Sequence, residues 1–148
     1  MKKIIAIDDN QLNLDYISAI LKVDFPKCQL LLSKSGSEGI EIAKRELPDT
    51  ILLDGLMPEM DGYEVCDILK NNKSTKNIPI VMVSALNETS HRIKGLNIGA
   101  DAYISKPFNR AELKAQINIM LRIKFAVDLL RKRNGNLEIL IKKQTDEF

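Results

Sequence analysis

The sequence has few cysteines and no long apolar run. Its two cysteines, Cys28 and Cys66, form neither a disulfide framework nor a zinc-binding spacing, and both lie among apolar residues, as buried thiols of a reducing compartment do. No apolar stretch approaches the roughly 20 residues that span a bilayer, and the apolar run that begins at Ile4 is too short for a secretory signal. We therefore expect a cytoplasmic protein that does not bind a membrane.

The sequence also has almost no excess of charge. The formal net charge is +2, and the basic residues are spread along most of the chain. This bias is too weak to indicate nucleic-acid binding, so we expect no direct contact with nucleic acid. The chain has 148 residues, with 45% hydrophobic and 28% charged side chains, which is typical of one globular domain with its own core.

Short apolar runs alternate with amphipathic segments through the first two thirds of the chain. Most runs are apolar throughout, which is typical of strands covered on both faces in a parallel sheet. Five strand–helix units predict an α/β domain with a doubly wound five-stranded parallel sheet. The expected strands are Ile4–Ile7, Leu30–Leu32, Ile51–Leu53, Ile80–Val83 and Ala102–Ile104, and the expected helices between them are Leu12–Val23, Ser37–Arg45, Tyr63–Leu69 and Ser90–Leu96, with Asn10 and Ser35 as N-caps.

The last quarter of the chain has a different pattern. From Arg110 to Phe148 there is no strand signal and no proline, which predicts one long helix. A fifth helix packed on the sheet needs to run only to about Ile123. We therefore place one domain at residues 1–123 and a helical extension at 124–148, which at about 1.5 Å per residue would project nearly 40 Å.

Polar side chains stand where the predicted strands end. These are Asp8 and Asp9 after the first strand, Asp54 after the third, Ser84 after the fourth and Lys106 after the fifth. The carboxyl ends of parallel strands meet at one edge of the sheet, where open α/β domains bind ligands. Clustered carboxylates repel one another, and a hard divalent cation such as Mg²⁺ would hold them together. The lysine suits a phosphoryl oxygen.

Each of these residues taken alone has a simpler interpretation. Asp8 or Asp9 can cap the first helix, Asp61 can turn the chain beside Gly62, and Ser84 can cap a loop. Their joint placement at one sheet edge favours a metal and phosphate site.

At this point the sequence resembles the receiver domain of bacterial two-component response regulators. The resemblance covers residues 1 to about 123, and it implies a flavodoxin-like sheet with strand order 2-1-3-4-5 and five helices, the last one extended here. It rests on five stretches: Asp8-Asp9, Asp54 followed by Met57-Pro58-Glu59-Met60-Asp61-Gly62, Ser84-Ala85, Gly99-Ala100-Asp101-Ala102-Tyr103 and Lys106-Pro107-Phe108.

The resemblance also implies a role for each residue of the site. Asp54 would be the phosphoacceptor, with Mg²⁺, or Mn²⁺ in its place, bound by Asp54, by Asp9 directly, by Asp8 through a water and by the backbone carbonyl of Leu56. The other residues would bind the phosphoryl group or change conformation when it is present. Ser84 and Lys106 would bind phosphoryl oxygens, Tyr103 would turn inward on activation, and a cis peptide between Lys106 and Pro107 would aim the lysine.

We therefore expect a phosphorelay switch and not an enzyme acting on an external metabolite. A histidine kinase or phosphotransfer protein would supply the phosphoryl group, and the switch would control an output module. A stand-alone relay protein or partner-binding regulator without an output domain is the alternative. An aspartate-nucleophile phosphatase would need a second acid where Leu56 stands, and an FMN protein would need a hydroxyl-rich loop where Asp8-Asp9-Asn10 stands.

The helical extension has the heptad pattern of a parallel two-stranded coiled coil, so we expect a homodimer through this helix. A solvated helix that frays is the alternative. The pattern is similar to the signalling helices that join receivers to kinase, PAS or cyclase modules, which favours a fragment of a longer protein. The expected a positions are Met120, Val127, Asn134, Ile141 and Phe148, and the d positions are Ile123, Leu130, Leu137 and Gln144.

Overall fold

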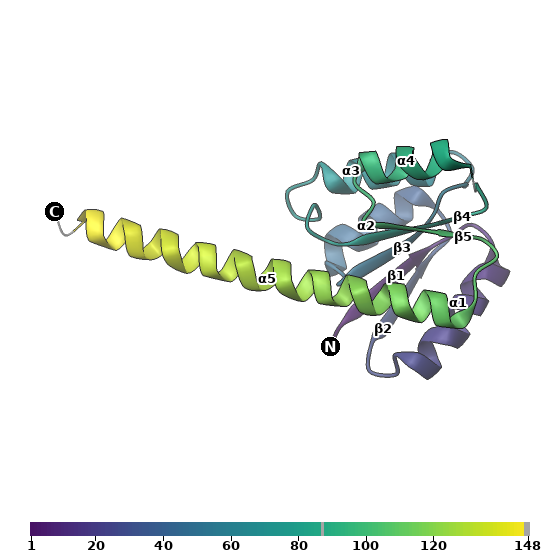
Figure 1. The fold of residues 1–148 in the computed structure, drawn as a ribbon, viewed down its shortest axis with the longest axis horizontal. Helices are drawn as coiled ribbons and strands as arrows, with labels where there is room; N and C mark the ends of the chain where they lie inside the picture. The colour runs from purple at the N-terminus through teal and green to yellow at the C-terminus, as the bar shows by residue number, and fades with distance from the viewer. Residues whose placement is uncertain (87, 147–148) are drawn as a thin grey trace.

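Five strands and five helices alternate along the chain (Figure 1). The computed structural model describes the backbone of residues 1–86 and 88–146, and the side chains of that part up to residue 133. The elements are β1 (Lys3–Ile7), α1 (Gln11–Asp24), β2 (Gln29–Ser33), α2 (Gly36–Glu46), β3 (Thr50–Asp54), α3 (Gly62–Lys70), β4 (Ile80–Ser84), α4 (Thr89–Ile98), β5 (Ala102–Ser105) and α5 (Arg110–Asp146).

All five strands pair in parallel in the order β2-β1-β3-β4-β5. The expected fold class and strand order are therefore confirmed. β3 lies at the centre between β1 and β4, and the buried residues of these three strands leave no polar face toward solvent. This arrangement explains why the strand sequences are apolar throughout and do not alternate.

Successive residues of each strand point to opposite faces of the sheet and divide the core in two. Odd-numbered β1 and β3 residues such as Ile5 and Leu53 pack with α2 and α3, while even-numbered ones such as Ile4 and Leu52 pack with α1 and α5. Figure 1 shows α3 and α4 on one side of the sheet and α1 and α5 on the other. The sheet is thus covered on both faces.

Side-chain caps fix where the first three helices on the chain begin. Asn10 accepts a hydrogen bond from the Leu12 N–H at 2.9 Å, and Ser35 accepts one from the Glu38 N–H at 3.2 Å, so both expected N-caps are confirmed. Asp61 caps α3 in the same way. It was expected to turn the chain, and its carboxylate accepts from the Glu64 N–H at 2.9 Å.

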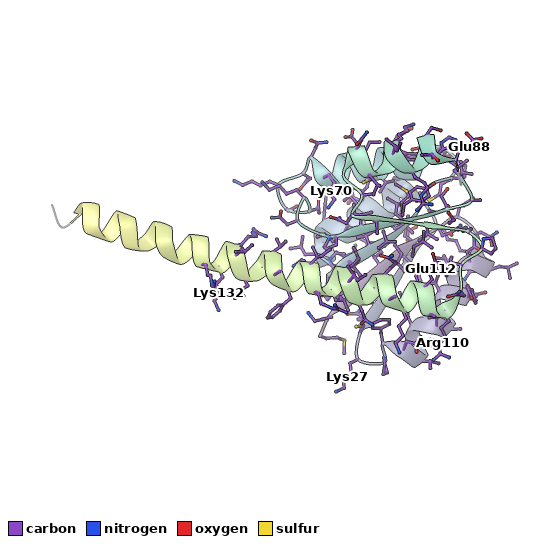
Figure 2. All side chains as sticks on the ribbon, in the orientation of Figure 1. Lys27, Lys70, Glu88, Arg110, Glu112 and Lys132 are labelled. Carbon is purple, nitrogen blue, oxygen red and sulfur yellow. The ribbon has the colours of Figure 1, made fainter. Side chains whose placement is uncertain are left out.

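Helix α5 packs on the sheet with its first three turns and then leaves it. Leu113, Ile117 and Met120 are buried in the core, and Ile123 is partly buried against it. Beyond that point α5 runs away from the domain, with Lys132 on the projecting part (Figure 2). No helix in the described part of the chain is long and apolar enough to cross a membrane.

The start of the expected coiled-coil seam is wrong, because Met120 lies in the core of its own domain and Ile123 packs against that core. Met120, the first expected a position, is 1% exposed because it faces the core of its own domain, so it is not free to face a partner helix. Val127 is half-buried and Leu130 is 58% exposed. The side chains of Asn134, Leu137, Ile141, Gln144 and Phe148 lie outside the described residues.

Candidate functional site

The ends of four strands bring the expected site residues to one edge of the sheet. Asp8 follows β1, Asp54 ends β3, Ser84 ends β4 and Lys106 follows β5. Asp8, Asp54 and Ser84 are buried, with 3%, 6% and 0% of their surface exposed. Buried polar groups at strand ends, with the apolar core directly beneath them, are placed for a ligand more than for stability.

Lys106 holds the two buried carboxylates together. Its Nζ lies 2.9 Å from Asp8 Oδ2 and 3.3 Å from Asp54 Oδ1. The peptide bond between Lys106 and Pro107 is cis, as the resemblance implies. The Lys106 ammonium group lies close enough to Asp54 to reach an oxygen of a group bonded to it.

The three acidic residues form a cluster that suits a divalent cation. One carboxylate oxygen from each of Asp8, Asp9 and Asp54 lies within 4.8 Å of the others. Asp9 is exposed, so its oxygens are open to solvent. With all three ionised, three negative charges against the one positive charge of Lys106 leave two in excess. An all-oxygen donor set with this charge fits Mg²⁺ or Mn²⁺.

The electrostatics of Asp54 show the same excess of negative charge. The pKa of Asp54 is raised to about 6, first by burial and then by the nearby Asp8 carboxylate, although Lys106 and the Leu56 N–H act to lower it. The Leu56 N–H donates to Asp54 Oδ1 at 3.3 Å. An added cation at this site would favour the ionised, nucleophilic form of Asp54.

Ser84 and Tyr103 are joined through the backbone of Leu86. The Ser84 hydroxyl accepts a hydrogen bond from the Leu86 N–H at 3.1 Å, and the Tyr103 phenol donates to the Leu86 carbonyl at 2.6 Å. Tyr103 is 8% exposed, so its ring lies inside the domain in this structure. The simpler interpretation of Ser84 as a loop cap is therefore also correct.

Three further residues shape the site, and reasoning from the sequence did not single them out. The Asn10 N–H and the Asn13 side-chain amide donate to Asp8 Oδ1 at 2.9 Å and 3.5 Å. A β-carbon on Gly62 would lie 2.2 Å from the Asp54 carbonyl oxygen, so only glycine lets the loop return this close to β3. The signal that could have identified the first two was the pair of asparagines, two and five residues after Asp8.

The comparison with known families agrees with this geometry. The model of the response regulator receiver domain matches residues 4–118, which is most of the chain. The chain belongs to this family. Receiver domains are the phosphoaccepting switches of two-component systems, and they bind Mg²⁺ in an acidic site of this kind.

Two curated relatives of the chain are longer proteins that it matches over part of their length. The response regulator PleD of Caulobacter vibrioides is 35% identical over 134 residues, which is 90% of this chain and 29% of PleD. A probable transcriptional regulator of Porphyridium aerugineum is 40% identical over 82% of this chain and 48% of its own length. The chain thus spans less than half the length of these two curated relatives.

Two solved receiver domains superpose closely on the chain. A CheY-like receiver domain protein from Methanospirillum hungatei is 27% identical, covers 85% of this chain and 98% of its own, and has a TM-score of 0.77. The receiver domain of a sensor histidine kinase from Pseudomonas aeruginosa is 28% identical, covers 82% and 97% of the two chains, and has a TM-score of 0.72. The latter holds a magnesium ion in its active-site cleft.

Proposed function

We propose that Asp54 is the phosphoacceptor of this receiver domain. The observation that carries the proposal is the buried Asp54 carboxylate at the end of β3, within 3.3 Å of Lys106 Nζ and beside Asp8 and Asp9. An Asp54 oxygen forms a bond to the phosphorus of a phosphohistidine, and the phosphorus–nitrogen bond breaks. The electron pair stays on that nitrogen, and because the other ring nitrogen of the phosphohistidine carries a proton, the imidazole leaves as a neutral ring. The product is an acyl phosphate on Asp54.

The chain's own residues position the phosphoryl group and balance its charge. Lys106 donates to one phosphoryl oxygen, and Ser84 donates to another. Asp9, Asp54 and the Leu56 carbonyl would hold Mg²⁺, and Asp8 would hold it through a water. When bound, the ion neutralises charge on the transferring oxygens. Mn²⁺ has the same preference for oxygen donors and serves in its place.

The product is a timed signal and not a released metabolite. The position two residues after Asp54, where a phosphatase needs a second acid, is Leu56, which is 50% exposed and cannot position a water by hydrogen bonding. The domain therefore catalyses its own phosphorylation and slow dephosphorylation. A histidine kinase or a phosphotransfer protein is the phosphodonor. This phosphodonor docks next to the site, in a groove of about 500 Å³ that is lined by Tyr16, Lys106 and Phe108.

The extended part of α5 carries the signal to an output module. Leu129, Leu130 and Phe125 are 43%, 58% and 65% exposed, and an isolated helix with such a surface is only marginally stable in water. We propose that a second copy of the chain covers the Leu130 side of this helix in a parallel coiled coil. The seam begins at Val127, since Met120 and Ile123 both pack in or against the domain core. A stand-alone regulator without an output module is the alternative.

Labelling by a small phosphodonor tests the assignment of Asp54. We expect the full chain, incubated with Mg²⁺ and acetyl phosphate, to gain the mass of one phosphoryl group in an acid-stable and base-labile form. Asp54→Ala should gain none, and Asp15→Ala, which removes an exposed carboxylate of α1, should react like the wild type. Stoichiometric labelling of Asp54→Ala would overturn the proposal, and turnover of a phosphate ester would favour the phosphatase.

A further inference from the structure

A second apolar stripe follows α5 where this helix leaves the domain. Leu121, Phe125 and Leu129 are spaced four residues apart, so they lie on one face of the helix, which we call the outer stripe. Leu121 is partly buried against the domain core, whereas Phe125 and Leu129 are 65% and 43% exposed. At about 100° per residue the outer stripe lies roughly opposite Val127 and Leu130, so the proposed coiled coil leaves it uncovered.

The outer stripe begins in a groove between α5 and the start of the chain. The groove has a volume of about 330 Å³ and is lined by Lys2, Asn118, Leu121, Arg122 and Phe125. Figure 1 shows the N-terminus close to the part of α5 that leaves the domain. The backbone of Lys2 is fixed there, because its carbonyl accepts a hydrogen bond from the Gln29 N–H at 2.8 Å. An apolar surface flanked by two basic side chains is thus open to solvent.

This part of α5 is strongly basic, although the net charge of the whole chain is only +2. From residue 121 to residue 133 there are five basic residues and one acidic residue, Asp128. Asp128 is already paired with Lys124 at 2.6 Å. Among the described side chains, neither Lys2 nor Arg122 forms an ion pair. The positive charge beside the groove therefore has no acidic counterpart within the described part of the domain.

We propose that the outer stripe and its groove bind an acidic amphipathic helix of a partner protein. Apolar side chains of the partner pack on Phe125 and Leu129, and its carboxylates pair with Lys2 and Arg122. A helix matches this surface because residues four apart on a helix share one face, as the apolar residues of the outer stripe do. The proposal does not depend on the phosphoryl chemistry of Asp54.

The shape and the apolar content of the surface favour a protein helix over other anionic partners. The groove is recessed between α5 and the start of β1, so it encloses an inserted side chain, whereas a bilayer presents a flat surface. Nucleic acid is contacted mainly by charged and hydrogen-bonding groups along its phosphates, which gives Phe125 and Leu129 no apolar counterpart. An acidic amphipathic helix supplies both apolar side chains and carboxylates.

A synthetic peptide serves as the probe for the full chain. The peptide has about 15 residues, enough to form a helix when bound, with leucines at helical spacing and glutamates elsewhere. We expect saturable binding, measured by the anisotropy of a fluorescent label, that weakens as salt is added. Amide chemical shifts should change at Leu121, Phe125 and Leu129. The same peptide with lysine in place of each glutamate should not bind.

Two variants and their matched controls locate the binding surface. Arg122→Glu should weaken binding of the acidic peptide about fivefold or more, and Phe125→Ser at least tenfold. Lys73→Glu makes the same charge change at an exposed residue after α3, and Leu47→Ser removes an exposed apolar side chain after α2. Both controls should bind like the wild type. Thermal unfolding checks that all four variants are folded.

The contrary outcomes are distinct. No binding of the acidic peptide, or equal binding by the wild type and Arg122→Glu, would overturn the proposal. Equal binding of the lysine peptide would show that charge does not select the partner. Tighter binding of mixed phosphatidylcholine and phosphatidylglycerol vesicles, or of a DNA duplex, lost in the same two variants, would assign the surface to a membrane or to nucleic acid instead.

Discussion

The Asp54 carboxyl group is destabilising in the folded protein as long as it is ionised and no cation is added. Its pKa is raised from 3.8 to about 6 by burial and by Asp8, so the folded chain binds a proton at Asp54 more tightly than the unfolded chain does. The free energy of unfolding therefore falls as the pH rises from about 4 to about 6. Above the folded-state pKa the full penalty is present.

Asp54→Asn should remove this penalty. We expect the free energy of unfolding at pH 7.5, with a metal chelator present, to rise by on the order of 2 kcal/mol, and the gain to vanish near pH 4. Lys106 keeps its partner, because Asp8 lies 2.9 Å from its Nζ. Urea unfolding at several pH values measures the effect. Asp9→Asn, which changes an exposed carboxylate, is the control with little gain. An equal gain for Asp54→Asn at both pH values would contradict the explanation.

The lifetime of the phosphoryl group should depend on two leucines. Leu56 and Leu86 stand two residues after the phosphoacceptor and two after the switch hydroxyl, positions that in this family border the path of the attacking water. Neither can hydrogen-bond a water into line, so the Leu56→Asn, Leu86→Glu double variant should hydrolyse about tenfold faster or more. The decay of the acyl phosphate after removal of acetyl phosphate measures the rate. Equal rates would show that these positions do not control the water.

Among the elements, the strands were the easiest to predict from the sequence and the register of α5 the hardest. The strands are short apolar runs, and polar side chains follow most of them. The sequence therefore predicted both the sheet and the positions of Asp54, Ser84 and Lys106 at its edge. The heptad pattern of α5 gives the spacing of its apolar residues, but it does not show which of them pack on the core of their own domain. That is why Met120 was assigned to a coiled-coil seam and lies in the core. The reason for Gly62 was missed because it is a close approach of the loop to Asp54, which no local pattern shows.

Helix α4 contacts the domain mainly through two tyrosine rings and Ile98, without a continuous apolar stripe. Of its ten residues, all described, Gly95 is the one that is buried. A β-carbon there would lie 3.4 Å from the Tyr103 ring and 3.5 Å from the Tyr63 ring. Lys94 lies 4.6 Å from the centre of the Tyr63 ring, and Arg92 lies 5.7 Å from that of Tyr103. Cation–π contacts of this kind at exposed side chains are individually weak.

Removing one phenol should loosen this helix selectively. The Tyr63 hydroxyl donates to the His91 carbonyl at 3.3 Å, inside α4. For Tyr63→Phe we expect amide hydrogen exchange in α4 to become about threefold to tenfold faster, the effect of one lost hydrogen bond, with α3 unchanged. Tyr16→Phe is the matched control, because its hydroxyl donates to the Phe108 carbonyl, far from α4 in the chain. Unchanged exchange in α4 would show that the ring contacts suffice.

At the scale of the whole molecule, α5 joins the phosphoryl site to the projecting helix. It begins at Arg110, four residues after Lys106, and the Arg110 side chain pairs with Asp24 at the end of α1 at 2.6 Å. The same helix then packs through Leu113 and Ile117 on the sheet before it leaves the domain. A rotation of α5 on the sheet would therefore change which face its projecting part presents to a second copy.

The projecting helix should make the chain a dimer. We expect the full chain to sediment as a dimer and a chain of residues 1–124 to sediment as a monomer, because the truncation removes the seam from Val127 onward. Leu130→Lys, at an exposed d position, should weaken the dimer at least tenfold, since a charge would be buried against its twin. Leu129→Lys, on the neighbouring exposed residue outside the seam, is the matched control and should leave the dimer intact. Monomers for both chain lengths would contradict the coiled coil, and equal dimers for both would place the interface on the receiver domain.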